Sequence, residues 1–312
     1  MASSMYIPQA QMANLRRLLV PGKVVVVYGA RRVGKTTLVE HLLADCGGDP
    51  LSVSGEDIAA RGYLESESIA KLKAFVGSHD RLVVDEAQHV KGIGLNLKLL
   101  TDHVPDLRIV ATGSSSFGLA RDSSAPLAGR RSTLNMYPLS QMEISGVEEP
   151  HETAGNLEMR LIYGSYPEVV TTDDNEERQR HLRDLVSSYL FKDILEFEGI
   201  RKSDKLVRLL QLLAFQIGNE VSLSELGSQL GMSKNTVDRY LDLLEQVFVI
   251  YRRPGFSRNL RKEISKSHRY YFFDNGIRNA VINNFNLLDL RDDVGALWEN
   301  YLMAERLKRQ EY

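Results

Sequence analysis

The sequence Gly29-Ala30-Arg31-Arg32-Val33-Gly34-Lys35-Thr36-Thr37 fills every position of the phosphate-binding pattern G-x-x-x-x-G-K-[ST]. It follows residues 23–28, a β-branched run of the kind that forms a buried parallel strand. It leads into residues 37–43, whose apolar side chains recur at helical spacing. A glycine-rich loop between a strand and a helix N-terminus presents backbone N–H groups to phosphate. The sequence therefore predicts a nucleotide triphosphate site, rather than a turn that matches the pattern by chance.

The loop supplies the predicted contacts with the nucleotide. Lys35 is predicted to reach the β- and γ-phosphates, and the hydroxyl of Thr36 is predicted to bind Mg²⁺. ATP and Mg²⁺ are therefore the expected cofactors. The predicted nucleotide-binding residues of the loop are Gly29, Arg32, Val33, Gly34, Lys35, Thr36 and Thr37.

A nucleotide triphosphatase also needs an acidic strand end, and residues 81–86, Arg-Leu-Val-Val-Asp-Glu, have one. Asp85 is predicted to hold Mg²⁺, and Glu86 is predicted to polarise the attacking water as a general base. The alternative is an ordinary strand that ends in a solvated acidic turn. The phosphate-binding loop in the same chain favours the catalytic interpretation.

A third apolar run, residues 107–112, leads into Gly113 and three serines. Ligands of open α/β folds bind at the carboxyl ends of the strands, so Thr112 and Ser114 are candidates for nucleotide contact. A serine-rich turn is the alternative. Arg130 and Arg131 stand just before a further predicted strand, residues 132–137.

Together these motifs resemble the AAA+-related prokaryotic P-loop ATPases that carry an uncharacterised C-terminal domain with a winged helix and a restriction-endonuclease-like part. The motifs concerned are residues 29–37, 83–88, 112–116 and 127–130. The likeness continues through residues 163–169, 189–194, 271–276 and 297–300, and so spans nearly the whole chain.

The resemblance implies roles for several polar residues. Ser114, in preference to Thr112, corresponds to the sensor of the γ-phosphate and the attacking water. Arg130 or Arg131 corresponds to the arginine finger that reaches the nucleotide of a neighbouring subunit, because a guanidinium stays charged and can contact two phosphate oxygens. A surface arginine pair is the alternative. The finger implies a ring or helical homo-oligomer, and we expect a hexamer.

The resemblance also implies a helical lid over the nucleotide. In related ATPases a turn of this type packs on the nucleotide, and Gly164-Ser165-Tyr166-Pro167 matches it, with Pro167 as the predicted contact. A proline that begins a helix is the structural alternative. A lid arginine should sense the γ-phosphate, and the sequence does not choose among Arg160, Arg178, Arg180 and Arg183.

Length and composition limit the remaining possibilities. A chain of 312 residues suits two or three domains. The net charge of −2 provides no overall basic field, so contact with nucleic acid would need a local patch. Cys46 is the only cysteine, which excludes an internal disulfide. No apolar run is long enough to span a bilayer and the N-terminus does not resemble a signal peptide, so we expect a cytoplasmic protein without membrane contact.

The order of the predicted elements indicates an α/β fold. We expect a P-loop, AAA+-type parallel-sheet core in residues 1–138 and a helical lid in residues 139–200. A winged helix-turn-helix should follow in residues 201–256. Residues 257–312 would begin a C-terminal α/β unit that is nuclease-like.

The predicted winged helix contains a possible nucleic-acid surface. Ser233 is expected to cap a helix that runs to about residue 246 and turns polar side chains outward. Winged helices also bind proteins, and charged faces are often merely solvated, so a docking module is the alternative. The predicted DNA contacts are Lys234, Asn235, Thr236, Arg239, Arg252 and Arg253, with further basic residues at Arg258, Arg261, Lys262, Lys266 and Arg269.

The C-terminal unit contains two acids, Asp274 and Glu299, that loosely suit the start of a nuclease fold. A nuclease centre also needs a later carboxylate strand and a lysine. The sequence reaches Tyr312 before any such strand, so we expect a truncated unit that does not cut DNA, and Asp274 as a turn residue.

These expectations combine into two functions. In the first, an oligomeric AAA+-type ATPase hydrolyses Mg·ATP to remodel DNA, including branched or junction DNA. In the second, a nucleotide-controlled switch or remodeller acts on a protein through the winged helix and C-terminal unit.

Overall fold

The computed structural model describes residues 6–114, 127–190, 203–254 and 268–312. These residues form two compact units, one of residues 8–136 and the other of residues 137–311 together with Tyr6 and Ile7. The division lies close to the predicted end of the core at residue 138. Beyond it, the described residues of the predicted lid, winged helix and C-terminal unit pack into one compact body.

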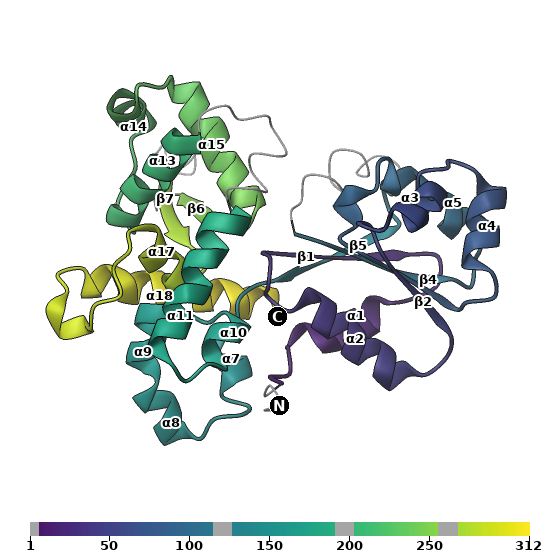
Figure 1. Cartoon of the computed structure of the whole chain (residues 1–312), viewed down its shortest axis with the longest axis horizontal. Coiled ribbons are helices and arrows are strands. Elements are labelled where there is room, and N and C mark those ends of the chain that lie inside the picture. The colour runs from purple at the N-terminus through teal and green to yellow at the C-terminus, as the bar shows by residue number, and fades with distance from the viewer. Residues whose placement is uncertain (1–5, 115–126, 191–202, 255–267) are drawn as a thin grey trace. The chain divides into compact units, whose positions relative to one another are not determined.

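The first unit is a parallel sheet with helices on both faces. Its elements are α1 (Gln11–Leu18), β1 (Val24–Gly29), α2 (Lys35–Cys46), β2 (Pro50–Ser54), α3 (Ile58–Leu64), α4 (Ile69–Val76), β3 (Arg81–Asp85), η1 (Ala87–His89), α5 (Ile93–His103), β4 (Arg108–Gly113) and β5 (Arg131–Met136). Five strands of the described residues pair in the order β2-β3-β4-β1-β5, all parallel. Helices α1 and α2 lie on one face of the sheet, and α3, α4 and α5 lie on the other (Figure 1).

The composition of the strands explains this architecture. Strand β1 reads Val-Val-Val-Val-Tyr-Gly and is buried along its whole length. A parallel sheet covered on both faces requires such continuous apolar runs, whereas the edge strands β2 and β5 are more exposed. The strands predicted at residues 23–28, 81–86, 107–112 and 132–137 are confirmed as β1, β3, β4 and β5, each within one residue of its expected bounds. The first unit is therefore the α/β core that the sequence predicts.

The strand register brings the motif residues to one edge of the sheet. Val27 of β1 pairs with Thr112 of β4, and Val84 of β3 pairs with Ala111. The loop after β1 and the carboxylate of Asp85 at the end of β3 therefore emerge beside Thr112. This is the carboxyl edge, where ligands of open α/β sheets bind.

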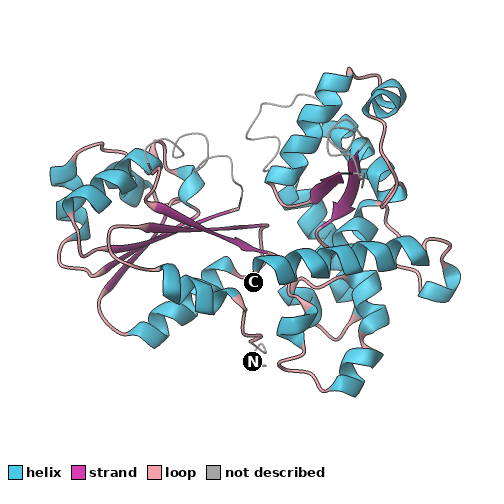
Figure 2. Cartoon of the chain, turned by 180° about the vertical axis from the view of Figure 1, so that it is seen from behind, coloured by secondary structure: helices cyan, strands magenta, loops and turns pink. Residues whose placement is uncertain are grey.

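The second unit is mostly helical and contains one short antiparallel strand pair (Figure 2). Its elements are α7 (Gln141–Ile144), α8 (Pro150–Gly155), α9 (Leu157–Tyr163), α10 (Pro167–Val170), α11 (Asn175–Asp184), the π-helical segment η2 (Leu185–Leu190), α13 (Ser203–Phe215), α14 (Leu223–Leu230), α15 (Lys234–Gln246), β6 (Ile250–Pro254), β7 (His268–Phe272), α17 (Asn275–Val281), η3 (Leu288–Leu290) and α18 (Val294–Glu311). Among the described residues, no helix is both long and apolar enough to cross a membrane.

Within residues 203–254, the helix that the sequence predicts from Ser233 to about residue 246 is present as α15. The side chain of Ser233 accepts from the N–H of Thr236 at 3.1 Å and caps α15, as expected. The partner of β6 is β7, with Ile250 opposite Phe272. The predicted boundary between residues 256 and 257 therefore falls between two paired strands. The assignment of this part as a winged helix stays a prediction.

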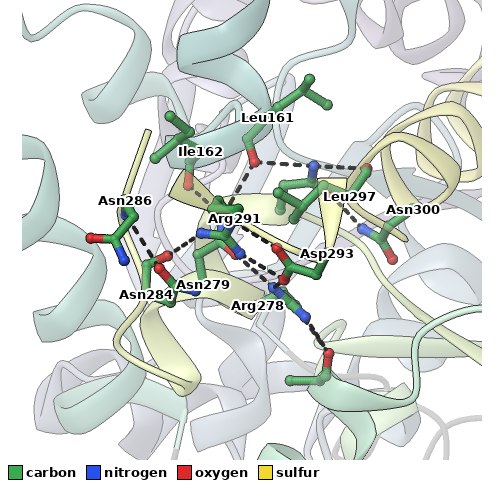
Figure 3. Close-up of polar contacts among 12 residues, drawn as sticks. Leu161, Ile162, Arg278, Asn279, Asn284, Asn286, Arg291, Asp293, Leu297 and Asn300 are labelled. Carbon is green, nitrogen blue, oxygen red and sulfur yellow. Dashed lines mark hydrogen bonds and ion pairs between the residues drawn. The ribbon is translucent and has the colours of Figure 1, made fainter. Parts of the chain in front are cut away.

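Buried polar side chains join the helices of the second unit (Figure 3). Arg278 is 1% exposed, donates to the carbonyl oxygen of Ala214 in α13 at 2.6 and 2.9 Å, and pairs with Asp293. Its neighbour Asn279 donates to the carbonyl oxygen of Ile162 in α9 at 2.7 Å. Helix α17 is thus bonded to helices from both the predicted lid and the predicted winged helix.

A second buried amide, that of Asn300 in α18, extends the edge of β7. Its oxygen accepts from the N–H of Phe272 at 2.8 Å, and its nitrogen donates to the carbonyl oxygen of Phe272 at 3.1 Å. The nitrogen also donates to the side chain of Asn275 at 2.7 Å. At Phe272 the side chain therefore takes the place of a neighbouring strand.

The two acids that loosely suit a nuclease have structural partners instead. Asp274 is 4% exposed and is the N-cap of α17, accepting from Ile277 N at 3.1 Å and from Ser165 N at 2.7 Å. The expectation of a turn residue is therefore corrected to a helix cap. Glu299 accepts from the hydroxyl of Tyr271 at 2.8 Å. Across the described residues, no group of three or more His, Cys, Asp or Glu side chains could hold a metal ion.

Candidate nucleotide-binding site

The phosphate-binding loop lies where the sequence predicts it, between the end of β1 at Gly29 and the start of α2 at Lys35. The side chain of Lys35 is buried, and its Nζ donates to the carbonyl oxygens of Gly29 and Ala30, both at 2.9 Å. The loop therefore holds its own lysine inward. Thr36 and Thr37 follow in the first turn of α2, whose N-terminal N–H groups favour an anion.

A glutamine from the N-terminal segment stabilises this loop. Gly34 caps α2 with φ of +96°, and a Cβ at that position would come within 2.5 Å of Gln9 Nε2. Gln9 is 7% exposed, and its Nε2 donates to the carbonyl oxygen of Val33 at 2.8 Å. Glycine is thus favoured by its conformation, and a Cβ there would displace the amide of Gln9. The sequence offers no pattern that would have predicted the contribution of Gln9.

The residues predicted to bind magnesium lie together. Thr36 Oγ1 donates to Asp85 Oδ2 at 3.0 Å, and Thr112 Oγ1 donates to Asp85 Oδ1. A hydroxyl and a carboxylate are hard oxygen ligands, and Mg²⁺ is usually held by one or two such groups together with phosphates and waters. The donor set of Thr36 and Asp85 therefore fits Mg²⁺.

The predicted general base has a constrained backbone. Glu86 has φ of +48° and ψ of +46°, a left-handed conformation that is uncommon for residues with a side chain and concentrates at functional sites. Its N–H donates to Thr112 Oγ1 at 3.1 Å. Its carboxylate accepts from Nε2 of Gln88, and the same nitrogen donates to Ser114 Oγ at 3.1 Å. The structure thus brings Glu86 and Ser114 together through Gln88, a residue to which the sequence assigned no role.

Arg130 and Arg131 lie at the opposite edge of the sheet from the loop. In the β1–β5 pair, Arg131 is opposite Val24, whereas Met136 is opposite Gly29. Five residue steps at about 3.3 Å each separate the two edges along β5, or about 16 Å. Arg130 forms an ion pair with Asp102.

The charge of Arg131 acts on a buried tyrosine. Burial raises the pKa of Tyr28 to about 12, against the lowering influence of Arg131. Both arginines therefore have interactions within their own unit.

The predicted lid turn belongs to the second unit and is explained by contacts there. Pro167 is the first residue of α10, and the carbonyl oxygen of Ser165 accepts from Leu139 N at 2.9 Å. Among the lid arginines, Arg160 is 4% exposed and paired with Glu148. Contact between Pro167 and the nucleotide stays a prediction.

The predicted nucleic-acid residues fall into two groups. Lys234, Asn235 and Arg239 are exposed on α15, and Thr236 is half-buried. Arg252 instead pairs with both Asp242 and Glu245, with its Nε 2.6 Å from Glu245 Oε2, so its charge is compensated within the protein.

The guanidinium of Arg253 lies 5.4 Å from the ring centre of Tyr251. The basic residues at 258, 261, 262 and 266 lie outside the described residues, and Arg269 is exposed on β7.

Comparisons with known proteins agree with the fold of the first unit. Residues 21–145 match the family model described as AAA domain. Residues 154–288 match the model of a domain of unknown function, DUF8612. A solved structure, the Walker-type ATPase of Pyrococcus abyssi, is similar with a TM-score of 0.58 at 16% identity, covering 89% of this chain and 96% of that one. The first unit therefore has the fold of an AAA+-related P-loop ATPase.

Relatives extend along nearly the whole chain. An uncharacterized protein of Mycobacterium tuberculosis is 26% identical over 301 residues, which cover 94% of this chain and 64% of that protein. An uncharacterized protein of Methanocaldococcus jannaschii is 24% identical over 310 residues, covering 93% of this chain and 68% of that protein. The chain thus spans 64% of the length of its mycobacterial relative.

Proposed function

We propose that the first unit binds Mg·ATP and hydrolyses it. The observation that carries the proposal is the convergence of Thr36, Asp85 and Thr112 through direct hydrogen bonds, beside a complete phosphate-binding loop. The first turn of α2 and the ends of β3 and β4 thereby contribute to one site at the carboxyl edge of the sheet. Chance matches to separate motifs would not be expected to meet in this way.

Each residue has a defined task in this reaction. Lys35 and the N–H groups of the loop bind the phosphates, and Thr36 and Asp85 would hold Mg²⁺, which neutralises charge on the β- and γ-phosphates when it is bound. Glu86 accepts a proton from the attacking water, and Ser114 contacts the γ-phosphate. Phosphoryl transfer depends mostly on positioning and electrostatics, which is what these groups supply.

Two substitutions test the site. Lys35→Ala should abolish tight binding of a fluorescent ATP analogue, whereas Glu86→Gln should preserve binding and stop phosphate release. Lys71→Ala, which removes an exposed lysine from α4, is the matched control and should behave as the parent. Hydrolysis at the parental rate by both site variants would refute the proposal.

We further propose that the active form is an oligomer in which Arg130 or Arg131 acts on the nucleotide of a neighbouring subunit. The support is their position at the edge of the sheet opposite the loop, which is too far for contact with the nucleotide of the same subunit. Mixing the Lys35→Ala variant with an Arg130→Ala/Arg131→Ala variant should restore activity. Mixtures without recovered activity, or a monomer under every nucleotide condition, would contradict the oligomer.

We propose that the macromolecule on which the ATPase acts, its client, is DNA bound along α15. The support is the exposed set Lys234, Asn235 and Arg239, whose side-chain types contact phosphates and base edges. Anisotropy titrations of duplex, single-stranded and branched DNA at several salt concentrations test it, with Lys234→Glu/Arg239→Glu as the variant and Lys71→Glu as the control. Binding should weaken with salt, with a log–log slope of roughly −0.9 for each phosphate contacted on duplex DNA.

A protein client is the second candidate, and the compensated charge of Arg252 favours it. The carboxylates of Asp242 and Glu245 remove part of the positive field that the sequence predicts beside α15. If DNA does not bind at low salt, or if binding is indifferent to the charge reversal on α15, the protein client replaces DNA in the proposal.

A further inference from the structure

One amide nitrogen, Nε2 of Gln88, serves both the predicted base and the predicted sensor. It donates one bond to the carboxylate of Glu86 and another, of 3.1 Å, to Ser114 Oγ. We propose that Gln88 is a positioning residue for ATP hydrolysis, which sets the direction of the hydrogen bonds made by Glu86 and Ser114. The inference rests on the proposed ATPase function and assigns a role that this function leaves open.

The chemistry of the three side chains fixes the orientation of the amide. A carboxylate oxygen is an acceptor only, so the amide must present its nitrogen to Glu86. A primary amide has two N–H bonds, and the second is then available to the hydroxyl oxygen of Ser114. Reversing the amide would place its oxygen against the carboxylate, which repels it.

This arrangement determines what each partner can still do. Because Ser114 Oγ accepts from Gln88, its own O–H proton is left to donate to an oxygen of the γ-phosphate. Because one oxygen of Glu86 is engaged by the amide, the other oxygen is left to accept a proton from the attacking water. Gln88 therefore directs a donor towards the phosphate and an acceptor towards the water.

The backbone around Gln88 holds the amide in place. Gln88 is the central residue of η1, which begins directly after Glu86. The carbonyl oxygen of Glu86 accepts from His89 N at 3.1 Å and closes this turn, while Thr112 holds the N–H of Glu86. The turn thus brings two side chains separated by one residue together, and the left-handed conformation of Glu86 makes this possible.

The other end of the amide is consistent with a site that holds a further polar group. Gln88 Oε1 is buried, and within the described part of the chain it has no hydrogen-bond partner. A buried acceptor without a partner is costly, so such groups in native structures call for an explanation.

The test separates positioning from stability. Gln88→Glu keeps the shape and removes both N–H donors, and Gln88→Leu removes all polarity. Each should lower kcat by roughly ten- to a hundredfold, the effect expected for losing a hydrogen bond to a charged group. The affinity for a non-hydrolysable ATP analogue should change less than about twofold, because the hydrogen bonds of Gln88 go to Glu86 and Ser114 rather than to the loop.

A control and a double variant make the test specific. His89→Ala alters the same turn at a side chain that faces Glu56, 3.6 Å away, and should keep parental turnover. If the amide of Gln88 acts through Ser114, the fold-loss of kcat in the Gln88→Leu/Ser114→Ala double variant should be much smaller than the product of the two single fold-losses.

The outcomes are distinguishable. A parent that binds the ATP analogue but releases no phosphate under any oligomeric condition refutes the ATPase proposal, and the role of Gln88 falls with it. A parent that turns over alongside Gln88 variants with unchanged kcat overturns only the role of Gln88. The role of Gln88 would also be overturned if the fold-losses of kcat multiplied in the double variant. The same holds if the Gln88 variants lost nucleotide affinity and thermal stability to the same extent as kcat.

Discussion

Replacing Asn300 with leucine should destabilise the second unit while leaving its shape nearly unchanged. The side chain is fully buried and makes three hydrogen bonds, two to the backbone of Phe272 and one to the side chain of Asn275. Leucine has a similar volume but satisfies none of these groups. Each buried polar group left unpaired costs about 1–3 kcal/mol, so we expect a loss of about 3–5 kcal/mol after the gain from burying leucine.

The chain provides its own probe for this measurement. Trp298 is the only tryptophan and lies in α18 of the second unit, so its fluorescence during urea unfolding reports on that unit. With a urea m-value of about 2 kcal/mol per M, the expected loss lowers the midpoint by roughly 1.5–2.5 M.

Asn286→Leu is the matched control, because the side chain of Asn286 is exposed. Its midpoint should stay within about 0.3 M of the parent, as expected for surface substitutions. If Asn300→Leu shifted the midpoint no more than this control does, the amide would not carry the stability that its three bonds imply.

Two further outcomes concern the same unit. Burial would raise the pKa of Asp293, but hydrogen bonds from Arg291 and the charge of Arg278 outweigh burial and lower the pKa. The ionised carboxylate therefore stabilises the folded state above the unfolded pKa of about 3.9, and this stabilisation is lost as pH falls through the lower folded pKa. The difference in urea midpoint between the parent and Asp293→Asn should accordingly shrink below about pH 4. Gly164 has φ of +75°, and an added Cβ would overlap the carboxylate of Asp274. Gly164→Ala should therefore lower the free energy of unfolding, measured by the same fluorescence, by more than about 1 kcal/mol. Gly155→Ala is the control and should not lower it, because a Cβ at Gly155 would meet open space.

The fold of the first unit could be predicted because its signals are local. The phosphate-binding loop, the run of valines in β1 and the acidic end of β3 are each contiguous in the sequence, and β1, β3, β4 and β5 each lie within one residue of their expected bounds. The helix cap at Ser233 is equally local, because the side chain bonds to a residue only three positions later. Patterns of this kind depend on a few neighbouring residues and so can be read directly from the chain.

The contacts that complete the site join residues far apart in the chain and have no such pattern. Gln9 reaches the loop from before β1, and Gln88, after the end of β3, reaches Ser114 at the end of the neighbouring strand β4. A single glutamine in a sequence does not indicate which of its two amide atoms will find a partner. The pairing of β6 with β7 was missed for the same reason, because it joins two strands assigned to different domains.

The buried polar contacts of the second unit bear on how a nucleotide could influence α15. Arg278 and Asn279 of α17 bond to the backbone of α13 and of α9, which the sequence assigns to the winged helix and the lid. Separating either helix from α17 would leave buried charged or amide groups without partners, at a cost of several kcal/mol. Nucleotide-driven motion of a lid that slid past the winged helix would have to meet that cost in every cycle. These bonds therefore make it costly for the helices of the second unit to move past one another.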